Sequence, residues 1–227
     1  GNMSGTGSLE KNGNGTVTLS GTNSYAGGTT VTNGTLAGTT DSLQGDITND
    51  GAVTFDQSSA GAYTGDMSGN GSLEKAGNGT LTLSGTNTYA GGTTVNTGGL
   101  AGTTDSLQGD ITNDGAVTFE QSSTGIYAGD MSGAGSLEKN GNGTVTLSGT
   151  NTYAGGTTVN TGGLAGTTDS LTGDITNNGA VTFDQSSSGA YAGDMSGNGS
   201  LEKAGNGTVT MSGTNTYAGG TTVSNGA

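Results

Sequence analysis

Apolar residues along this chain come singly, each separated from the next by one polar residue or by a break that contains glycine. The alternation is clearest at 15–20, 80–83, 116–119 and 156–159, where one face of a short strand would face a core and the other face water. Asn-Gly, Asp-Gly and Gly-Gly pairs between these segments suit corners that need a positive φ. No window has apolar residues at helical spacing, and glycine interrupts every stretch. The pattern predicts an all-β chain of very short strands.

The same pattern returns along the chain at a constant spacing. Two series of residues show it: Met3, Met67, Met131 and Met195, and Leu9, Leu73, Leu137 and Leu201. The chain therefore contains repeats at 1–64, 65–128 and 129–192 and a partial repeat at 193–227. A fixed period of this kind is typical of solenoid proteins, so we expect one continuous segment over residues 1–227.

Two arrangements of the strands are open. Asn-Gly and Asp-Gly are also signals for antiparallel hairpins, but strands of three to five residues make poor hairpin ladders. Coiling lets each strand pair with the turns above and below it. A weaker sub-period of roughly 16 to 28 residues then predicts a parallel β-solenoid with about three rungs in each repeat. At about 4.8 Å per rung, about ten or eleven rungs would make a rod on the order of 50 Å long.

Stability has to come from stacking, because a single rung buries almost nothing. The alternation assigns an inward-facing set to one repeat, which we expect to form the core. The expected core residues are Met131, Leu137, Val145, Leu147, Val159, Leu164, Leu171, Ile175, Val181 and Phe183.

Composition narrows the class of protein. The 227 residues include 50 glycines, four lysines, no arginine, histidine, cysteine or proline, and carry a net charge of -14. Low hydrophobicity with high charge could indicate disorder, but fixed spacing of the apolar residues favours an ordered chain. Four lysines cannot neutralise a nucleic-acid backbone, and an acidic chain disfavours an anionic membrane surface. Apolar runs of two or three residues cannot insert into a bilayer.

The residues available for chemistry are few. Without histidine or cysteine, nucleophilic triads and imidazole acid–base pairs are excluded. Aspartates could form a polysaccharide-cleaving site, but they recur in every repeat, which indicates a surface feature. We therefore expect no enzyme and no cofactor.

Calcium is the alternative for the acidic residues. The weak candidates for ligands lie in loops at 103–114 and 167–178, and they are Asp105, Asp110, Asp114, Asp169 and Asp174. Carboxylates are suitable calcium ligands. The glycine-aspartate nonapeptide of calcium β-rolls is absent, however, and Asn178 stands where Asp114 stands one repeat earlier. Solvated acidic faces are the favoured interpretation.

Lysine and tyrosine each occupy one series of equivalent positions. Lys11, Lys75, Lys139 and Lys203 each follow a glutamate, and we expect them to face solvent and prevent edge pairing. An isopeptide crosslink is the alternative, and it would need a buried apolar site with a carboxylate. The tyrosines of the second series are Tyr25, Tyr89, Tyr153 and Tyr217. We expect them to pack at corners, with an exposed aromatic ladder that stacks on glycans as the alternative.

A longer motif, which lies at 135–159 within the recurring stretch 133–164 of the third repeat, occurs four times with few changes. It reads Gly-Ser-Leu-Glu-Lys-x-Gly-x-Gly-Thr-[Val/Leu]-Thr-[Leu/Met]-Ser-Gly-Thr-Asn-Thr-Tyr-x-Gly-Gly-Thr-Thr-Val. This motif resembles the passenger-associated transport repeat of autotransporter and autotransporter-like adhesins of Gram-negative bacteria. The resemblance implies a right-handed parallel β-helix passenger that is secreted and displayed on the outer cell surface. It also implies that the repeat aids export by folding stably outside the cell.

These observations lead to two functional hypotheses. The first is a structural rod or stalk segment of an extracellular adhesin or fibre. Its partners would be further copies of itself, end to end or laterally, and glycans or proteins of a host or neighbouring cell. The second is a binding module whose repeated face recognises glycans or calcium many times, each time weakly.

Overall fold

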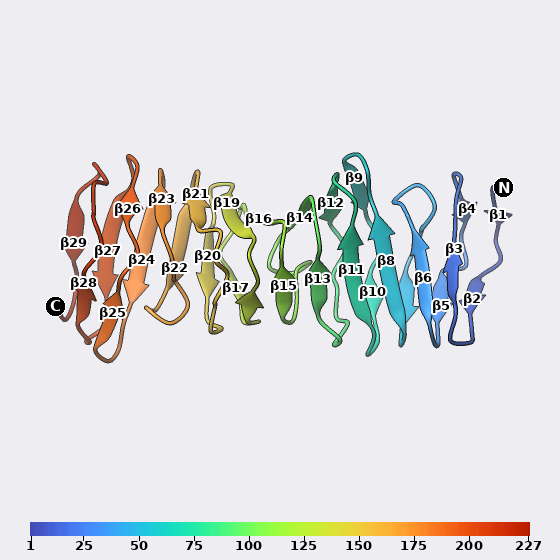
Figure 1. The fold of residues 1–227 in the computed structure, drawn as a ribbon, viewed down its shortest axis with the longest axis horizontal. Helices are drawn as coiled ribbons and strands as arrows, with labels where there is room; N and C mark the ends of the chain where they lie inside the picture. The colour runs from blue at the N-terminus through green and yellow to red at the C-terminus, as the bar shows by residue number, and fades with distance from the viewer. The chain divides into compact units, whose positions relative to one another are not determined.

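The computed structural model describes all of residues 1–227, which form strands, turns and loops without a helix. It consists of two compact units, Gly1–Ala116 and Val117–Ala227. Figure 1 shows the short strands of each unit following one another in parallel ladders. The prediction of an all-β, parallel β-solenoid is therefore confirmed. None of its elements is a helix that could span a membrane.

The first unit contains three columns of strands, here called sheets I, II and III. Within this unit, sheet I contains β2 (Leu9–Lys11), β5 (Thr29–Val31), β7 (Ile47–Asn49) and β10 (Met67–Ser68). Sheet II contains β3 (Thr16–Thr18), β6 (Thr35–Gly38), β8 (Ala52–Asp56), β11 (Ser72–Ala76), β13 (Thr93–Val95) and β15 (Ile111–Asn113). Sheet III contains β9 (Gly61–Tyr63), β12 (Thr80–Leu83) and β14 (Gly99–Gly102), and β1 (Ser4–Gly5) pairs with β4 (Ser24–Tyr25).

The second unit repeats this design. Within it, sheet IV contains β19 (Ser136–Asn140), β21 (Thr157–Val159), β23 (Ile175–Asn177) and β26 (Met195–Ser196). Sheet V contains β17 (Gly125–Tyr127), β20 (Thr144–Leu147), β22 (Gly163–Gly166), β24 (Ala180–Asp184), β27 (Ser200–Ala204) and β29 (Thr221–Val223). β25 (Gly189–Tyr191) pairs with β28 (Val209–Met211), and the remaining strands are β16 (Ala116–Glu120) and β18 (Met131–Ser132).

The strand register shows how many turns one repeat contains. In sheet I, Leu9 pairs with Thr29, Thr29 with Ile47, and Ile47 with Met67, so three turns lead from Leu9 to Met67. The repeat equivalent of Leu9 is not Met67 but Leu73. The segment between them leads the chain round one corner, from β10 to β11. Each repeat therefore contains the three expected turns and, in addition, one corner.

The additional corner places equivalent strands in different sheets. β2 lies in sheet I, whereas β11, its equivalent in the next repeat, lies in sheet II. The second unit has the same register: Leu137, Thr157, Ile175 and Met195 stack in sheet IV. The strand equivalent to β19 is β27, which pairs with β24 in sheet V. One sequence repeat therefore does not correspond to a whole number of turns.

Glycine is required at the corner between β10 and β11. Gly69 has a φ of 106°, which side chains other than that of glycine rarely accept. A Cβ atom at Gly69 would also lie 2.2 Å from the carbonyl oxygen of Asn49, one turn below. Turns separated by a single strand spacing leave no room for a methyl group there, so any other residue would push the two turns apart.

The interior of each turn is filled by the residues that alternate inward. All ten residues expected in the core of the third repeat are buried, and none exposes more than 1% of its surface. Phe183 packs against Tyr191 with the ring centres 5.2 Å apart, and Phe55 packs against Tyr63 in the first unit at 5.1 Å. Such tilted aromatic pairs add to the stability that burial itself provides.

Replacement of Val145 by aspartate should lower the stability of the second unit far more than replacement of Thr146. Val145 is 0% exposed, whereas Thr146 faces outward on the same strand. An unpaired carboxylate in the core should cost about 3 kcal/mol or more, and one on the outer face less than about 1 kcal/mol. Urea unfolding of both variants measures this difference. Equal shifts of the midpoint would contradict the inward and outward assignment.

Candidate functional site

The four lysines lie inside the solenoid, so the expectation that they face solvent is wrong. Lys11, Lys75, Lys139 and Lys203 expose 4%, 0%, 0% and 5% of their surface. Lys75 stands in the inward column of sheet II, in register with Phe55 on one side and Val95 on the other. The alternation within β11 explains this placement, because Leu73 and Lys75 point inward while Glu74 points outward.

Each lysine ammonium group connects two turns. Lys75 Nζ donates hydrogen bonds to the carbonyl oxygens of Ala76 and Gly77 at 2.8 and 2.7 Å. A third bond, of 3.2 Å, reaches the carbonyl oxygen of Thr97 in the next turn. Lys139 makes the same three contacts in the second unit, with Asn140, Gly141 and Thr161. We call this arrangement the lysine tie.

The contacts of the lysine tie indicate a structural role. All hydrogen bonds of the four Nζ atoms end on backbone carbonyl oxygens, so no side-chain amide or carboxyl group is placed for an isopeptide bond. Burial lowers the pKa of the Lys75 and Lys139 amines, while the negative charges of Asp56 and Glu120 act in the opposite direction. Charge-assisted bonds to three carbonyl groups compensate for removing the ammonium group from water.

A series of buried asparagines performs a similar task, which the sequence pattern alone does not predict. Asn87 is 1% exposed; its Oδ1 accepts a hydrogen bond from the Met67 amide at 2.9 Å, one turn below. Its Nδ2 donates to the Ser106 carbonyl oxygen at 2.8 Å, one turn above. Asn151 makes the equivalent bonds in the second unit. The feature of the sequence that could have identified these asparagines is the recurring Gly-Thr-Asn segment, which places an asparagine where the column of strands continues.

Several aspartates accept backbone hydrogen bonds from the next turn. Asp46 Oδ1 accepts from the amide of Asp66 at 2.9 Å, and Asp66 Oδ1 accepts from the amide of Thr86 at 2.7 Å. In the second unit, Asp130 and Asp194 accept from the amides of Thr150 and Thr214. Each of these amides lies one turn beyond the aspartate. These carboxylates therefore extend the hydrogen bonding between turns into the corners.

The five aspartates considered for calcium lie in the connections between β14 and β15 and between β22 and β23, and just after β15. Asp105 and Asp169 occupy the turns after β14 and β22, where their carbonyl oxygens accept from Asn87 and Asn151. The Asp110 carbonyl oxygen accepts from Thr93, and the Asp114 amide donates to Val95. Asp174 Oδ1 accepts from the Asp194 amide at 2.9 Å. No three or more Asp or Glu side chains gather closely enough to hold a metal ion.

Three of the four tyrosines in this series are buried at corners and do not form an exposed ladder. Tyr25, Tyr89 and Tyr153 expose 7%, 2% and 2% of their surface, whereas Tyr217 is half-buried. The hydroxyl of Tyr89 shares a hydrogen bond of 2.7 Å with the hydroxyl of Thr93, and Tyr153 does the same with Thr157. Rings in these positions have no free face on which a sugar could stack.

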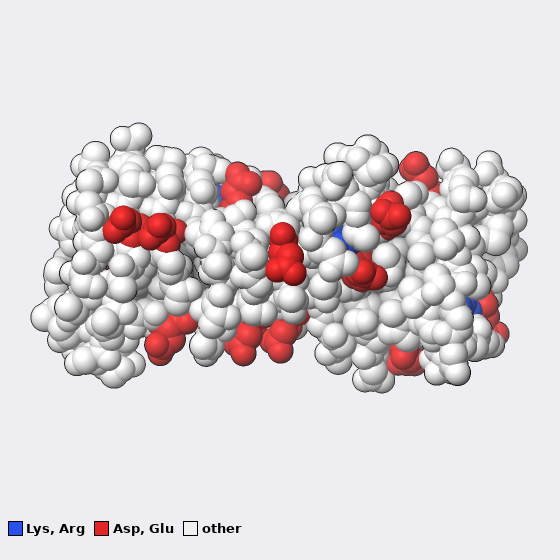
Figure 2. All heavy atoms as spheres, viewed as in Figure 1, with Lys and Arg blue, Asp and Glu red and all other residues white.

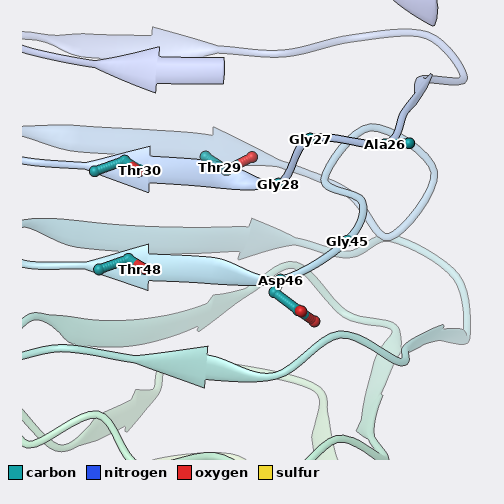
Figure 3. A pocket seen from close by; sticks show the side chains of 8 residues that line it. All are labelled: Ala26, Gly27, Gly28, Thr29, Thr30, Gly45, Asp46 and Thr48. Carbon is teal, nitrogen blue, oxygen red and sulfur yellow. The ribbon is translucent and has the colours of Figure 1, made fainter. Parts of the chain in front are cut away.

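A hollow of about 400 Å³ lies beside sheet I in the first unit. Figure 3 shows Thr30 and Thr48 on neighbouring strands and Asp46 at the start of the lower one. A Cβ atom at Gly28 would lie 3.1 Å from the Asp46 carbonyl oxygen, so the glycine keeps this corner open. Hydroxyl groups and one carboxylate can hydrogen bond a polar molecule, but they provide no pair of nucleophile and base.

The accessible charge of the molecule is almost purely negative. None of the 18 acidic residues is buried, whereas all four lysines are. Figure 2 shows separate groups of carboxylates on both units and only small areas of blue. The outer surface therefore carries more uniform negative charge than the composition alone suggests, which favours solubility and repels anionic surfaces.

Replacement of Lys75 by methionine should destabilise the first unit, although methionine keeps an apolar stem of similar length. The carbonyl groups of Ala76, Gly77 and Thr97 lose their shared donor, which should cost about 1–3 kcal/mol. Urea unfolding followed by circular dichroism measures the change. Thr112→Met on the exposed face of β15, in the same sheet, is the matched control and should shift the midpoint little. A Lys75→Met variant as stable as this control would show that the lysine tie contributes nothing.

The buried tyrosines should make the fold sensitive to alkali. Burial raises the pKa of Tyr89 and of Tyr153 to about 12, and burial followed by the charges of nearby aspartates raises the pKa of Tyr63 and Tyr191 further. An unfolded tyrosine ionises near pH 10. Above about pH 10 the unfolded chain therefore releases protons that the folded chain retains, and stability falls as pH rises. The lowered pKa values of Lys75 and Lys139 have the opposite effect on stability. Below about pH 10.5 the folded chain releases these lysine protons before the unfolded chain does, so their contribution to stability increases as pH rises.

We expect phenolate absorbance to rise together with the loss of the strand signal in circular dichroism during an alkaline titration. Complete ionisation of the tyrosines near pH 10 with the strand signal intact would rule out their burial.

Comparison with known proteins agrees with the repeat found in the sequence. The model of the passenger-associated-transport-repeat family matches residues 9–37, 73–101, 137–165 and 201–227, which together make up half of the chain. A curated relative, the adhesin BmaC autotransporter of Brucella suis biovar 1 (strain 1330), is 36% identical over 169 residues. The match covers 60% of this chain but only 5% of that protein's length. No solved structure matches the chain. The chain belongs to the passenger-associated-transport-repeat family.

Proposed function

We propose that the chain is a rod-like segment of the passenger of a bacterial adhesin that is secreted or displayed on the outer surface of a Gram-negative cell. Its role would be structural: it builds length and aids folding outside the cell. Membership of a passenger repeat family and the similarity to a protein named as an adhesin autotransporter support this assignment.

One observation carries the structural role. Many of the charged and amide side chains are engaged in bonds between successive turns: lysine with carbonyl groups, asparagine with both neighbouring turns, and aspartate with amides. No buried side-chain nitrogen or oxygen lacks a hydrogen-bond partner. Polar residues arranged in this way stabilise the stack of successive turns. We therefore propose a non-enzymatic function.

The same bonds explain how such a segment would aid export. A turn gains its stability from the turns beside it, so each turn that emerges outside the cell can fold onto the one already formed. Every added turn extends the stack by about 4.8 Å. The absence of cysteine means that no disulfide has to form before folding. Stacking energy released outside the cell would then oppose backward movement of the chain.

An export experiment tests this proposal. The full chain, preceded by a signal peptide and an epitope tag, is fused to an autotransporter translocator in a bacterium that lacks periplasmic proteases. Val145→Asp should reduce the ratio of surface-exposed to total tag several-fold, because its turn cannot stack. Thr146→Asp on the outer face is the matched control and should export like the parent chain. Equal surface ratios for all three would contradict a role of stacking in export.

A further inference from the structure

The segments that line the hollow beside sheet I recur in the following repeats, where they belong to other sheets. The segments Ala-Gly-Gly-Thr-Thr and Gly-Asp-Ile-Thr, which line the hollow, recur unchanged at 90–94 and 109–112. The lack of room for a side chain at Gly28 also recurs: an added Cβ atom would lie 3.0 Å from the Asp110 carbonyl oxygen at Gly92, and 3.1 Å from the Asp174 carbonyl oxygen at Gly156. Yet Thr30 and Thr48 belong to sheet I, whereas their equivalents Thr94 and Thr112 belong to sheet II.

The register explains this change of sheet. Because three turns from Leu9 end at Met67 and the repeat ends at Leu73, each repeat leads the chain through three turns and one corner. A turn with three strand columns has three corners, so one corner corresponds to about a third of a turn, or roughly 120°. The axial advance is about 16 Å per repeat.

We propose that successive repeats display their identical surfaces in different directions, about 120° apart around the axis of the unit in which both lie. This inference deepens the rod function and depends on that function for its biological meaning, but its geometry stands on the register alone.

The arrangement limits the kind of partner that can use several repeats at once. A rigid partner lying along one side of either unit meets a given surface in one repeat but not its equivalent in the next. A partner that bound neighbouring repeats, about 16 Å apart, would have to reach around the axis. Simultaneous engagement is lost when the spacing cannot be spanned, so closely spaced multivalent binding along one side is disfavoured. This geometry argues against the repeated-face module and in favour of single contacts at defined directions.

Pairs of spin labels measure the rotation directly, because the chain contains no cysteine that would have to be removed. In the second unit, Glu138, Thr158, Thr176 and Ser196 form one outward column of sheet IV through three successive pairings. Glu202, the repeat equivalent of Glu138, pairs instead with Thr182 in sheet V. The two informative variants are Glu138→Cys with Ser196→Cys, and Glu138→Cys with Glu202→Cys.

The first pair should give the shorter distance. Residues 138 and 196 lie three strand spacings apart on one side, about 14 Å between backbones. The second pair should be longer by on the order of 10 Å, because it also crosses the width of the core. The opposite order, with the Glu138 and Glu202 labels closer together, would mean that the repeat contains whole turns and would overturn the proposal. Equal distances would overturn it as well.

The first unit offers an independent copy of the measurement. Glu10→Cys with Ser68→Cys is the pair within sheet I, and Glu10→Cys with Glu74→Cys is the pair one repeat apart. Circular dichroism of each labelled variant shows whether the strands are retained. Failure of the predicted order with intact strands would remove the rotation but leave the rod function in place. Failure of the export experiment would remove the role of stacking in export but leave the rotation in place.

Discussion

The structure depends on hydrogen bonds between residues that lie one turn of the solenoid apart in the sequence. No strand exceeds five residues, so no turn can be stable by itself. Backbone pairing holds the strands, and polar side chains continue the pairing where the strands stop. The lysine tie, the buried asparagines and the corner aspartates all connect a turn to its neighbour. Glycine at the corners allows the turns to approach closely enough for these bonds.

This dependence explains how so polar a chain can form a stable fold. Only 27% of its residues are hydrophobic, yet those that alternate inward are almost completely removed from water. Polar groups that would weaken such a core are each supplied with a partner. The interior therefore combines polar and apolar side chains, and a lysine can occupy the same column as a phenylalanine.

The fold class, the core and the packing of the tyrosines could be predicted from the sequence, because alternation and periodicity determine which side chains face inward. The lysine tie could not, although Leu73 and Lys75 have the same parity in one strand. A charge ordinarily argues against burial, and the carbonyl groups that surround the ammonium group come together only once the corner has formed. The length of a single turn is also hidden in the sequence, because three turns and one corner combine into one regular repeat.

The exchange of the lysine ammonium protons with water tests most directly whether buried polar side chains tie the turns together. A sample labelled with nitrogen-15 at lysine alone contains four labelled side chains, and NMR spectroscopy reports the exchange of each. Lys75 and Lys139, which are 0% exposed and bonded to three carbonyl groups, should give slowly exchanging ammonium signals. Exchange at the rate of free lysine for both residues would contradict the account.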